Sequence, residues 1–437
     1  FEGQPSEISH QSFWLDGIGK PPMPSDVALQ NADVVIVGSG YTGLNAAIET
    51  ARGGRTTLVL DADEIGFGCS TRNGGQISTS VKPTLEKLTA NFGPEKARAI
   101  RQEGANALEW IEDRVRQENI ACDFVRAGRY HAAHTPQHYE IIAREAAQLQ
   151  REENIEAHAV AHSDQRSELG SDKYFGGVVF PRHASIHPAK YHRGLVQTAL
   201  AAGAIVKGHC RVLDIHRNQN GFGITTEKGQ ISAKSVIVAT NGYTSNLTPW
   251  LRRRVIPIGS NIIATTPLPE SLVDKLFPKN RIASDTCKVL YYYRASPDRR
   301  RILFGGRVAA REVGLQRATP RLYESMCNIF PELKDFGVSH SWGGTVAYSF
   351  DELAHIGIHD GVHYAVGYCG SGVSMASFLG MRLGQKVLGL KEGRTAFDDL
   401  PHPTQPFYTG RPWFLPAMIS WYRWRDRHQA KMAAAGR

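Results

Sequence analysis

The sequence has 437 residues and no apolar run long enough to cross a membrane. A membrane-spanning helix needs about 20 consecutive apolar residues, so we expect no transmembrane segment. The first residues, Phe1 to Pro5, include no basic segment leading into an apolar one, and we therefore expect no secretion signal. Apolar residues make up 41% of the chain and charged residues 21%, as in ordinary globular proteins. A cytoplasmic location fits these features.

Cysteine is scarce, and the six cysteines form no Cys-x-x-Cys pair. A chain of this size needs no disulfide framework, and reduced thiols agree with a cytoplasmic protein. No group of cysteines and histidines has the spacing of a zinc site, so we expect no metal.

Acidic residues (42) are fewer than lysines and arginines (51), which gives a formal net charge of +9. The triple-arginine runs at 252–254 and 299–301 are short, and no nucleic-acid-binding module surrounds them. We expect no nucleic-acid partner and take these runs as surface, with attraction of an acidic substrate or partner as the alternative. The tail from Trp413 to Arg425 interleaves aromatic residues and arginines. We interpret it as a packed strap, with peripheral membrane contact or RNA binding as alternatives.

The segment 33–62 has the pattern of a dinucleotide site. An apolar, β-branched run precedes Gly38, Gly40 and Gly43, a helix-compatible run follows, and a second apolar run ends in Asp61. The first glycine permits a tight turn, the second lets the backbone approach a pyrophosphate, and the third lets the helix pack close to the strand. The helix start then favours phosphates, and Asp61 can accept the ribose hydroxyls.

The next segment, 65–76, holds four glycines together with Ser, Thr, Arg and Asn. Such a loop forms a poor strand and a poor helix, but it offers many backbone N–H groups to a flat ligand. It follows the second strand of the nucleotide unit directly. We therefore favour contact with a cofactor over a plain surface loop.

Hydrophobic periodicity places helices at 94–119, 137–152 and 189–202. Short alternating runs at 212–216, 222–226 and 236–239 predict an antiparallel meander that returns to the main sheet and ends in a turn at 239–242. Strand formers within 255–350 predict a second sheet, whose connections Pro267, Pro269, Pro278 and Pro320 would mark. It could be a substrate wall or plain core.

A strand at 362–366, a glycine-rich turn at 367–372 and a helix at 373–388 repeat the strand, turn and helix order near the C-terminus. Further motifs extend along nearly the whole chain. They are Phe13-Trp14-Leu15, Gly66-x-Gly68-x-Ser70-x-Arg72-Asn73-Gly74-Gly75-Gln76, Leu303-Phe304-Gly305-Gly306-Arg307, Trp342-x-Gly344-Thr345, Asp351-Glu352-Leu353-Ala354-His355-Ile356-Gly357, Gly367-Tyr368-x-Gly370-x-Gly372, and Pro406-Phe407-Tyr408 with Pro412-Trp413-Phe414-Leu415-Pro416.

With these motifs the sequence resembles the FAD-dependent D-amino-acid-oxidase (DAO) superfamily, and within it the gamma-glutamylputrescine oxidoreductase branch. Two positions depart from the usual pattern, because Asp61 stands where relatives have Glu, and Ala354 stands where Pro commonly precedes the histidine.

The resemblance implies an α/β fold in which a Rossmann-like FAD-binding domain of the glutathione-reductase type is interleaved with a mixed-sheet substrate domain. The expected divisions are an N-terminal arm (1–32), an FAD-binding domain (33–90, 180–250 and 351–390), a substrate domain (91–179 and 251–350) and a C-terminal strap (391–437).

The cofactor that the resemblance implies is FAD, bound non-covalently, although Cys369 is the candidate by sequence for covalent attachment. The ADP half would lie at the first glycine turn, segment 72–76 near the isoalloxazine, and Gly370 to Val373 at its pyrimidine edge. The residues predicted to bind FAD are Gly38, Ser39, Gly40, Tyr41, Thr42, Gly43, Asp61, Ala62, Ser70, Arg72, Asn73, Gly74, Gly75, Gln76, Val212, Ala239, Thr240, Gly242, Gly370, Ser371, Gly372 and Val373.

The implied reaction is oxidation of a C–N bond in a small amine or amino-acid-like substrate, such as gamma-glutamylputrescine. A neutral amine would pass a hydride to flavin N5, and the imine would hydrolyse. An aromatic, desolvating pocket favours the unprotonated amine, and its candidate walls are Tyr291, Tyr293, Trp342 and Tyr348. Arg307 or His355 could hold a substrate carboxylate.

The final electron acceptor would be oxygen or another acceptor. Two alternative functions stay open at this point. One is an amino-acid dehydrogenase that passes electrons to a quinone or carrier, and the other is a nucleotide-binding protein without flavin.

Overall fold

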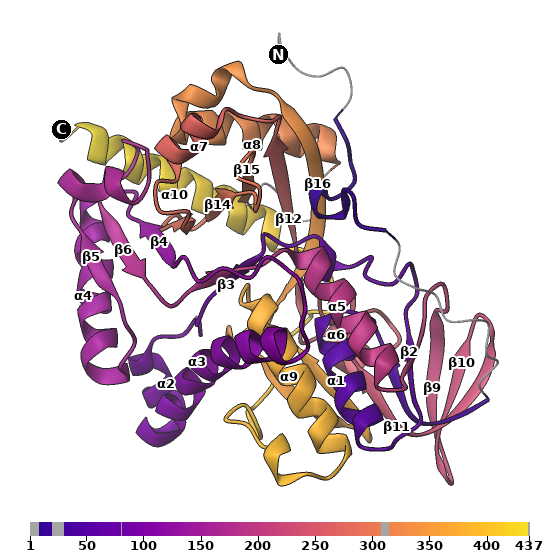
Figure 1. The fold of residues 1–437 in the computed structure, drawn as a ribbon. Coiled ribbons are helices and arrows are strands. Elements are labelled where there is room, and N and C mark those ends of the chain that lie inside the picture. The colour runs from indigo at the N-terminus through magenta and orange to yellow at the C-terminus, as the bar shows by residue number, and fades with distance from the viewer. Residues whose placement is uncertain (1–7, 20–29, 80, 307–313, 436–437) are drawn as a thin grey trace.

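The computed structural model describes residues 8–19, 30–79, 81–306 and 314–435, and it contains two eight-stranded sheets (Figure 1). Helices α1 (Tyr41–Arg52), α5 (Pro188–Ala201) and α9 (Gly372–Val387) lie with the first sheet. Helices α7 (Glu270–Leu276) and α8 (Leu315–Ile329) lie with the second. The mixed α/β fold is therefore the one that the sequence predicts.

The first sheet has the order β17-β18-β11-β1-β2-β8, and the β9–β10 hairpin continues it from β11. Neighbours from β18 to β8 are parallel, while β17 and the hairpin are antiparallel. The strands are β1 (Asn31–Val37), β2 (Thr57–Leu60), β8 (Ile205–Lys207), β9 (Val212–Asn218), β10 (Gly221–Thr226), β11 (Gly229–Val238), β17 (His355–His359) and β18 (Val362–Val366).

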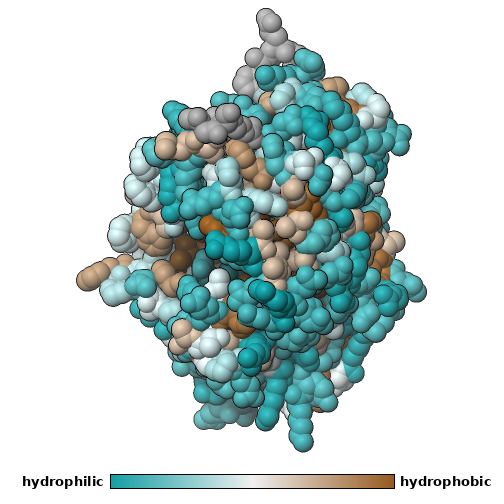
Figure 2. Space-filling model, turned by 90° about the vertical axis from the view of Figure 1, so that its left-hand side faces the viewer, coloured by the Kyte–Doolittle hydropathy of each residue, from teal (hydrophilic) through white to brown (hydrophobic). Residues whose placement is uncertain are grey.

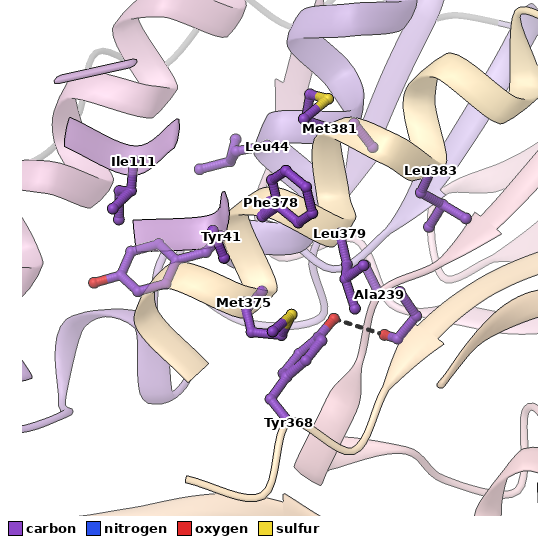
Figure 3. Close-up of a cluster of buried hydrophobic side chains, with 14 of the residues drawn as sticks. Tyr41, Leu44, Ile111, Ala239, Tyr368, Met375, Phe378, Leu379, Met381 and Leu383 are labelled. Atoms are coloured by element: carbon purple, nitrogen blue, oxygen red, sulfur yellow. Dashed lines mark hydrogen bonds between the residues drawn. The ribbon is translucent and has the colours of Figure 1, made fainter. Parts of the chain in front are cut away.

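Helices α1 and α9 share the core that covers this sheet. Figure 3 shows Tyr41 and Leu44 of α1 beside Met375, Phe378 and Leu379 of α9, all buried. The two helices approach closely because α9 has glycine at the contact. A Cβ on Gly380 would lie 2.4 Å from the Thr42 carbonyl oxygen, so a larger residue would push the helices apart.

The second sheet is mixed and has the order β16-β12-β15-β14-β13-β4-β6-β5. Only the β13–β4 pair is parallel among its described neighbours. The strands are β4 (Arg129–Ala132), β5 (His158–Val160), β6 (Gly177–Phe180), β12 (Ile256–Thr265), β13 (Ile282–Asp285), β14 (Tyr291–Ala295), β15 (Ile302–Gly306) and β16 (Val338–Tyr348). One face buries a core with α8, which includes Phe304 and Leu322.

The remaining elements connect these two units. A small third sheet pairs β3 (Gln76–Ile77) with β7 (Ala184–Ser185). The other helices are α2 (Leu85–Phe92), α3 (Pro94–Gln117), α4 (Pro136–Glu153), α6 (Pro249–Arg252) and α10 (Leu415–Ala435). The strands of the first sheet lie in the three segments predicted for FAD, except that β1 begins at Asn31, in the predicted N-terminal arm. The chain passes repeatedly between the two sheets. The exact domain boundaries stay a prediction.

The structure differs from the sequence predictions at Pro320 and adds detail on the C-terminal segment. Pro320, expected to mark a connection, lies inside α8, a helix over 315–329 where no element was predicted. The C-terminal segment, expected as a packed strap, contains helix α10, which buries Ile419 but leaves Trp421 and Trp424 each 56% exposed.

None of the described helices is long and apolar enough to cross a membrane. The face in Figure 2 is mainly hydrophilic, and apolar side chains gather around a hollow in it. Contact of the exposed tail aromatics with a membrane surface stays a prediction.

Candidate functional site

A cavity of about 490 Å³ lies between the two sheets. Its wall combines the first glycine turn, the glycine-rich loop, one face of the second sheet and the second glycine turn. Ligand cavities of proteins typically measure about 300–1,000 Å³. The two glycine turns, more than 300 residues apart in sequence, thus face one shared space.

The first glycine turn joins β1 to α1. Gly38 has a φ of +107°, which L side chains rarely adopt. A Cβ on Gly43 would lie 2.0 Å from the Gly38 carbonyl oxygen, so only glycine lets α1 start this close to the strand. Gly40 has no side chain to cap α1, and the Tyr41 N–H donates to Ser70 Oγ of the loop at 3.1 Å. Because Gly40 itself supplies no capping group, an anion could approach the other N–H groups of this helix start.

Asp61 at the end of β2 braces this turn. Its Oδ2 accepts hydrogen bonds from the Ser39 backbone N–H at 2.8 Å and from Ser39 Oγ at 2.5 Å. Ser39 is fully buried and does not line the cavity, whereas Asp61 and Ala62 do. The carboxylate therefore holds the glycine turn with one oxygen while it lines the space where a ribose would lie.

The second glycine turn joins β18 to α9. Gly370 has a φ of +95°, and α9 begins at Gly372 without a side-chain cap from Ser371. A Cβ on Gly372 would meet no protein atom within 4 Å. All three residues and Val373 line the cavity. A second helix start is therefore directed at the same space as the first.

The loop 69–76 is held by hydrogen bonds from distant parts of the chain. The Trp342 Nε1–H donates to the Arg72 carbonyl at 2.9 Å, and the Trp14 Nε1–H donates to the Asn73 carbonyl at 2.7 Å. The Gln76 side-chain amide donates to main-chain carbonyls of β13 and β14. The loop is thus fixed between the N-terminal arm and the second sheet.

The wall formed by the second sheet follows the alternation of strand side chains. Tyr292 lines the cavity, and its hydroxyl lies 2.9 Å from Ser260 Oγ. Tyr291 and Tyr293, the predicted wall residues, are on the opposite face of the sheet and stack on Phe304. An aromatic side chain therefore lines this part of the cavity, but it belongs to Tyr292 and not to its two predicted neighbours.

A cationic patch on this wall was not recognised in the sequence. Arg129 of β4 lines the cavity, and its Nε and Nη2 both donate to Ser284 Oγ of β13. Lys82 also lines the cavity, 5.9 Å from the centre of the Tyr348 ring. Only the pairing of β4 with β13 brings Arg129 beside Ser284, 155 residues away, so no local pattern could have revealed it.

Most residues predicted to bind FAD line the cavity. They are Gly38, Gly40, Tyr41, Thr42, Asp61, Ala62, Ser70, Arg72, Asn73, Gly74, Gln76, Val212, Ala239, Thr240, Gly370, Ser371, Gly372 and Val373. Four others support this wall from behind: Ser39, Gly43, Gly75 and Gly242. Gly242 packs against β16, and a Cβ on Gly242 would lie 2.6 Å from the Thr345 carbonyl oxygen.

Of the predicted substrate residues, Tyr348 lines the cavity. Trp342 is 1% exposed, and its indole N–H donates to the Arg72 carbonyl of the loop 69–76. His355 is 2% exposed, lies 3.0 Å from Asp351 through Nε2, and stacks on His402, so it is placed as a structural residue. Arg307 lies outside the described residues.

Cys369, the sequence candidate for a covalent flavin link, is buried and is not among the cavity residues. Its Sγ donates to the Gly367 carbonyl, and burial raises the pKa of the thiol to about 11. Cys69 lines the cavity instead. A buried thiol with a high pKa is a poor nucleophile, so Cys369 is a poor candidate for a covalent flavin link.

These residues fit a dinucleotide cofactor. Two helix starts whose N-cap residues supply no side-chain cap meet one cavity, and Gly372 leaves room that a Cβ would fill. No group of three or more Cys, His, Asp or Glu that could hold a metal occurs in the part of the chain that the structure describes.

The sequence pattern of the family described as DAO, FAD dependent oxidoreductase, matches residues 33–386. The chain belongs to the DAO family. The gamma-glutamylputrescine oxidoreductase of Escherichia coli K12 is 31% identical over 400 residues, which cover 90% of this chain and 93% of that protein. The probable oxidoreductase OrdL of Rhizobium meliloti is 31% identical over 444 residues, which cover 97% of this chain and 99% of that protein.

Solved structures of more distant DAO-like proteins share the fold. Glycine oxidase from Geobacillus kaustophilus superposes with a TM-score of 0.70 at 18% identity, covering 86% of this chain and 99% of that one. L-proline dehydrogenase from P. horikoshii superposes with a TM-score of 0.69 at 16% identity, covering 85% of this chain and 96% of that one. These likenesses concern the fold, and the family match identifies the chain as an FAD-dependent oxidoreductase.

Proposed function

We propose that this DAO-family protein oxidises the C–N bond of an amine or amino-acid-like substrate, with gamma-glutamylputrescine as the first compound to test. The observation that carries the proposal is one shared cavity, in which two helix starts face an aromatic and cationic wall. The relative named as gamma-glutamylputrescine oxidoreductase supports the choice of substrate.

The first glycine turn and α1 would hold the pyrophosphate of FAD, with Asp61 at the ribose. Segment 72–76 and the turn at 370–373 would hold the flavin, non-covalently. The chemistry that FAD supplies when bound is acceptance of a hydride equivalent from the carbon beside the amine nitrogen.

The protein would favour the reactive form of the substrate by electrostatics. An amine must be unprotonated to give up a hydride equivalent, and nearby positive charge together with desolvation lowers an amine's pKa. Arg129 and Lys82 supply the charge, while Tyr292 and Tyr348 supply apolar surface that excludes water. The chain's own residues would thus bind and orient the amine and favour its unprotonated form, with the proton released to solvent, so that no dedicated general base is required.

The electron acceptor divides two versions of this function. An oxidase would reduce oxygen, and a dehydrogenase would pass electrons to a quinone or carrier. The exposed Trp421 and Trp424 of α10 are the feature that supports the second version, because exposed aromatic side chains can mark a docking surface.

The test starts with the visible spectrum of the purified protein, which should show bound flavin. An amine panel that includes gamma-glutamylputrescine is then added under argon, and loss of the flavin absorbance identifies substrates. Admission of air and a peroxide assay separate oxidase from dehydrogenase. If no amine bleaches the flavin, while a chemical reductant does, the proposed substrate class is refuted.

A further inference from the structure

A second hollow, of about 400 Å³, has a described lining that shares no residue with that of the cavity. Two stretches far apart in sequence form it, and its lining consists of Asn246, Pro249, Arg252, Arg253, Thr409 and Arg411. Three of these lining residues are arginines, and none of them is acidic. The volume falls within the range of small-molecule sites. The hollow is therefore a cationic pocket of its own, which we call the arginine pocket.

The arginine run 252–254 divides between this pocket and the packing of the protein. Arg254 donates through Nε to the His402 carbonyl at 2.9 Å and through Nη1 to the Trp250 carbonyl at 3.0 Å. Its Cζ lies 3.8 Å from the centre of the Trp250 ring. Arg252 and Arg253 line the arginine pocket instead. One member of the run thus has a structural role, and the charges of the other two belong to the pocket.

The other arginine run, 299–301, shows how the protein satisfies arginines that serve its own structure. Arg299 forms an ion pair with Asp274. Arg301 donates through Nη1 to the Thr265 carbonyl at 2.8 Å and to Ser339 Oγ at 2.9 Å. The two runs have the same sequence, so the difference between them lies in the partners that the fold supplies.

The guanidinium groups of the arginine pocket have few partners of their own. Arg252 donates through Nη1 to Asn246 Oδ1, which fixes the direction of that side chain. Arg253 and Arg411 are exposed, and none of the described residues accepts a hydrogen bond from either guanidinium or forms an ion pair with it. Because each guanidinium has five N–H donors, most donors in the pocket are available to a ligand.

The backbone around the pocket is held in place although its arginines are exposed. The hydroxyl of the buried Tyr408 donates to the Val255 carbonyl at 2.7 Å. Gly410 has a φ of +88°, and a Cβ at this position would overlap the side chain of Arg252. The C-terminal segment therefore packs closely on the arginine run, and it carries Arg411 to the same pocket. The pocket is thus built by the fold and does not result from the arginine run alone.

We propose that the arginine pocket binds a small phosphorylated molecule. Three positive charges without an acidic neighbour favour a ligand with more than one negative charge, and guanidinium groups match the oxygens of a phosphate in pairs. A stable protein interface buries about 1,200–2,000 Å², far more than this small concave pocket can offer. No aromatic side chain occurs among its described lining residues, so a nucleic-acid base would find no stacking surface.

The site is adjacent to the cofactor cavity but separate from it. Asn246 lines the arginine pocket, while its neighbours Ser245 and Leu247 line the cavity. A phosphorylated ligand in the pocket would therefore lie beside the cavity without entering it. The proposal does not depend on which amine the protein oxidises.

Calorimetric titration with pyrophosphate tests the site. The FAD-loaded protein is used, because FAD would then occupy the phosphate site proposed at the first glycine turn. Low salt is needed, since salt screens exposed charges. Arg253→Gln and Arg411→Gln should each weaken pyrophosphate binding about 5- to 20-fold, as expected for a charged hydrogen bond discounted for exposure to solvent. Arg300→Gln is the matched control with unchanged affinity, because Arg300 is exposed, belongs to the other run and lies outside the pocket.

Four results would overturn the inference. They are the absence of measurable pyrophosphate binding, binding that survives in the Arg253→Gln and Arg411→Gln double variant, citrate binding as tight as that of pyrophosphate, and tighter binding of an acidic peptide or an oligonucleotide through the same arginines. Retained flavin and an unchanged melting temperature are the folding check, and the single variants decide if the double variant does not fold. The amine panel is a separate assay, so failure of the amine oxidation would leave this result unaffected.

Discussion

Replacement of Gly372 by alanine separates the cofactor site from the scaffold that carries it. Gly372 is the first residue of α9, its φ is not in the left-handed region, and an added Cβ meets no protein atom within 4 Å. The apoprotein should therefore be as stable as wild type, or more stable by up to about 1 kcal/mol, because alanine is the better helix former.

The same methyl group would occupy space in the cavity, against the proposed flavin edge. Inserting a methyl into a packed contact costs about 1–3 kcal/mol, which corresponds to an FAD affinity about 5- to 150-fold weaker. The assay is titration of deflavinated protein with FAD, together with urea unfolding of the apoprotein.

Gly380→Ala in the same helix is the control. Its Cβ would lie 2.4 Å from the Thr42 carbonyl oxygen, so it should lower the free energy of unfolding by about 1–3 kcal/mol even without FAD. Wild-type FAD affinity in a well-folded Gly372→Ala protein would show that the cofactor does not lie against the start of α9.

Three further changes test other parts of the argument. Burial raises the pKa of Asp285 to about 7, above its unfolded value of about 4. Between pH 4 and pH 7 the folded protein therefore keeps a proton on Asp285 that the unfolded chain has lost. The free energy of unfolding should accordingly fall as pH rises from 4 to 7. Asp285→Asn should flatten that slope in urea melts at several pH values, and an unchanged slope would contradict the burial argument. Ser39→Ala removes a hydroxyl that donates to Asp61 and should cost about 1.5–3 kcal/mol in the same assay; a loss within error would mean that the bond does not brace the turn. Trp342→Phe leaves the Arg72 carbonyl without its indole donor, and flavin should be lost faster on dialysis; retention equal to wild type would argue against a fixed loop.

The parts of the site that could be predicted are those encoded by local spacing. Each glycine turn combines strand, turn and helix within about thirty residues, and the acid at Asp61 follows at a fixed distance. The structure gives physical reasons for these residues, such as the 2.0 Å approach of a Cβ at Gly43 to the Gly38 carbonyl oxygen. At such positions the local backbone geometry admits only glycine, so the glycine pattern in the sequence reveals the turn.

The substrate wall could not be predicted in the same way. Three consecutive tyrosines, 291 to 293, leave open which face of the sheet the middle one occupies, because that depends on the pairing of β14 with β13 and β15. Arg129 and Ser284 meet through long-range pairing of β4 with β13. Helix α8 was missed because Pro320, taken as the mark of a connection, lies inside it, while the apolar face of the helix packs on the core of the second sheet.

The two indole rings that hold the cavity loop have a practical consequence. Trp14 and Trp342 donate to the adjacent carbonyls of Asn73 and Arg72, so both rings lie a few ångströms from a loop that borders the cavity. Tryptophan emission overlaps flavin absorption, and energy transfer over such short separations is efficient. The protein thus contains its own optical reporter, and ultraviolet-excited emission should dim as each molecule takes up its yellow ligand.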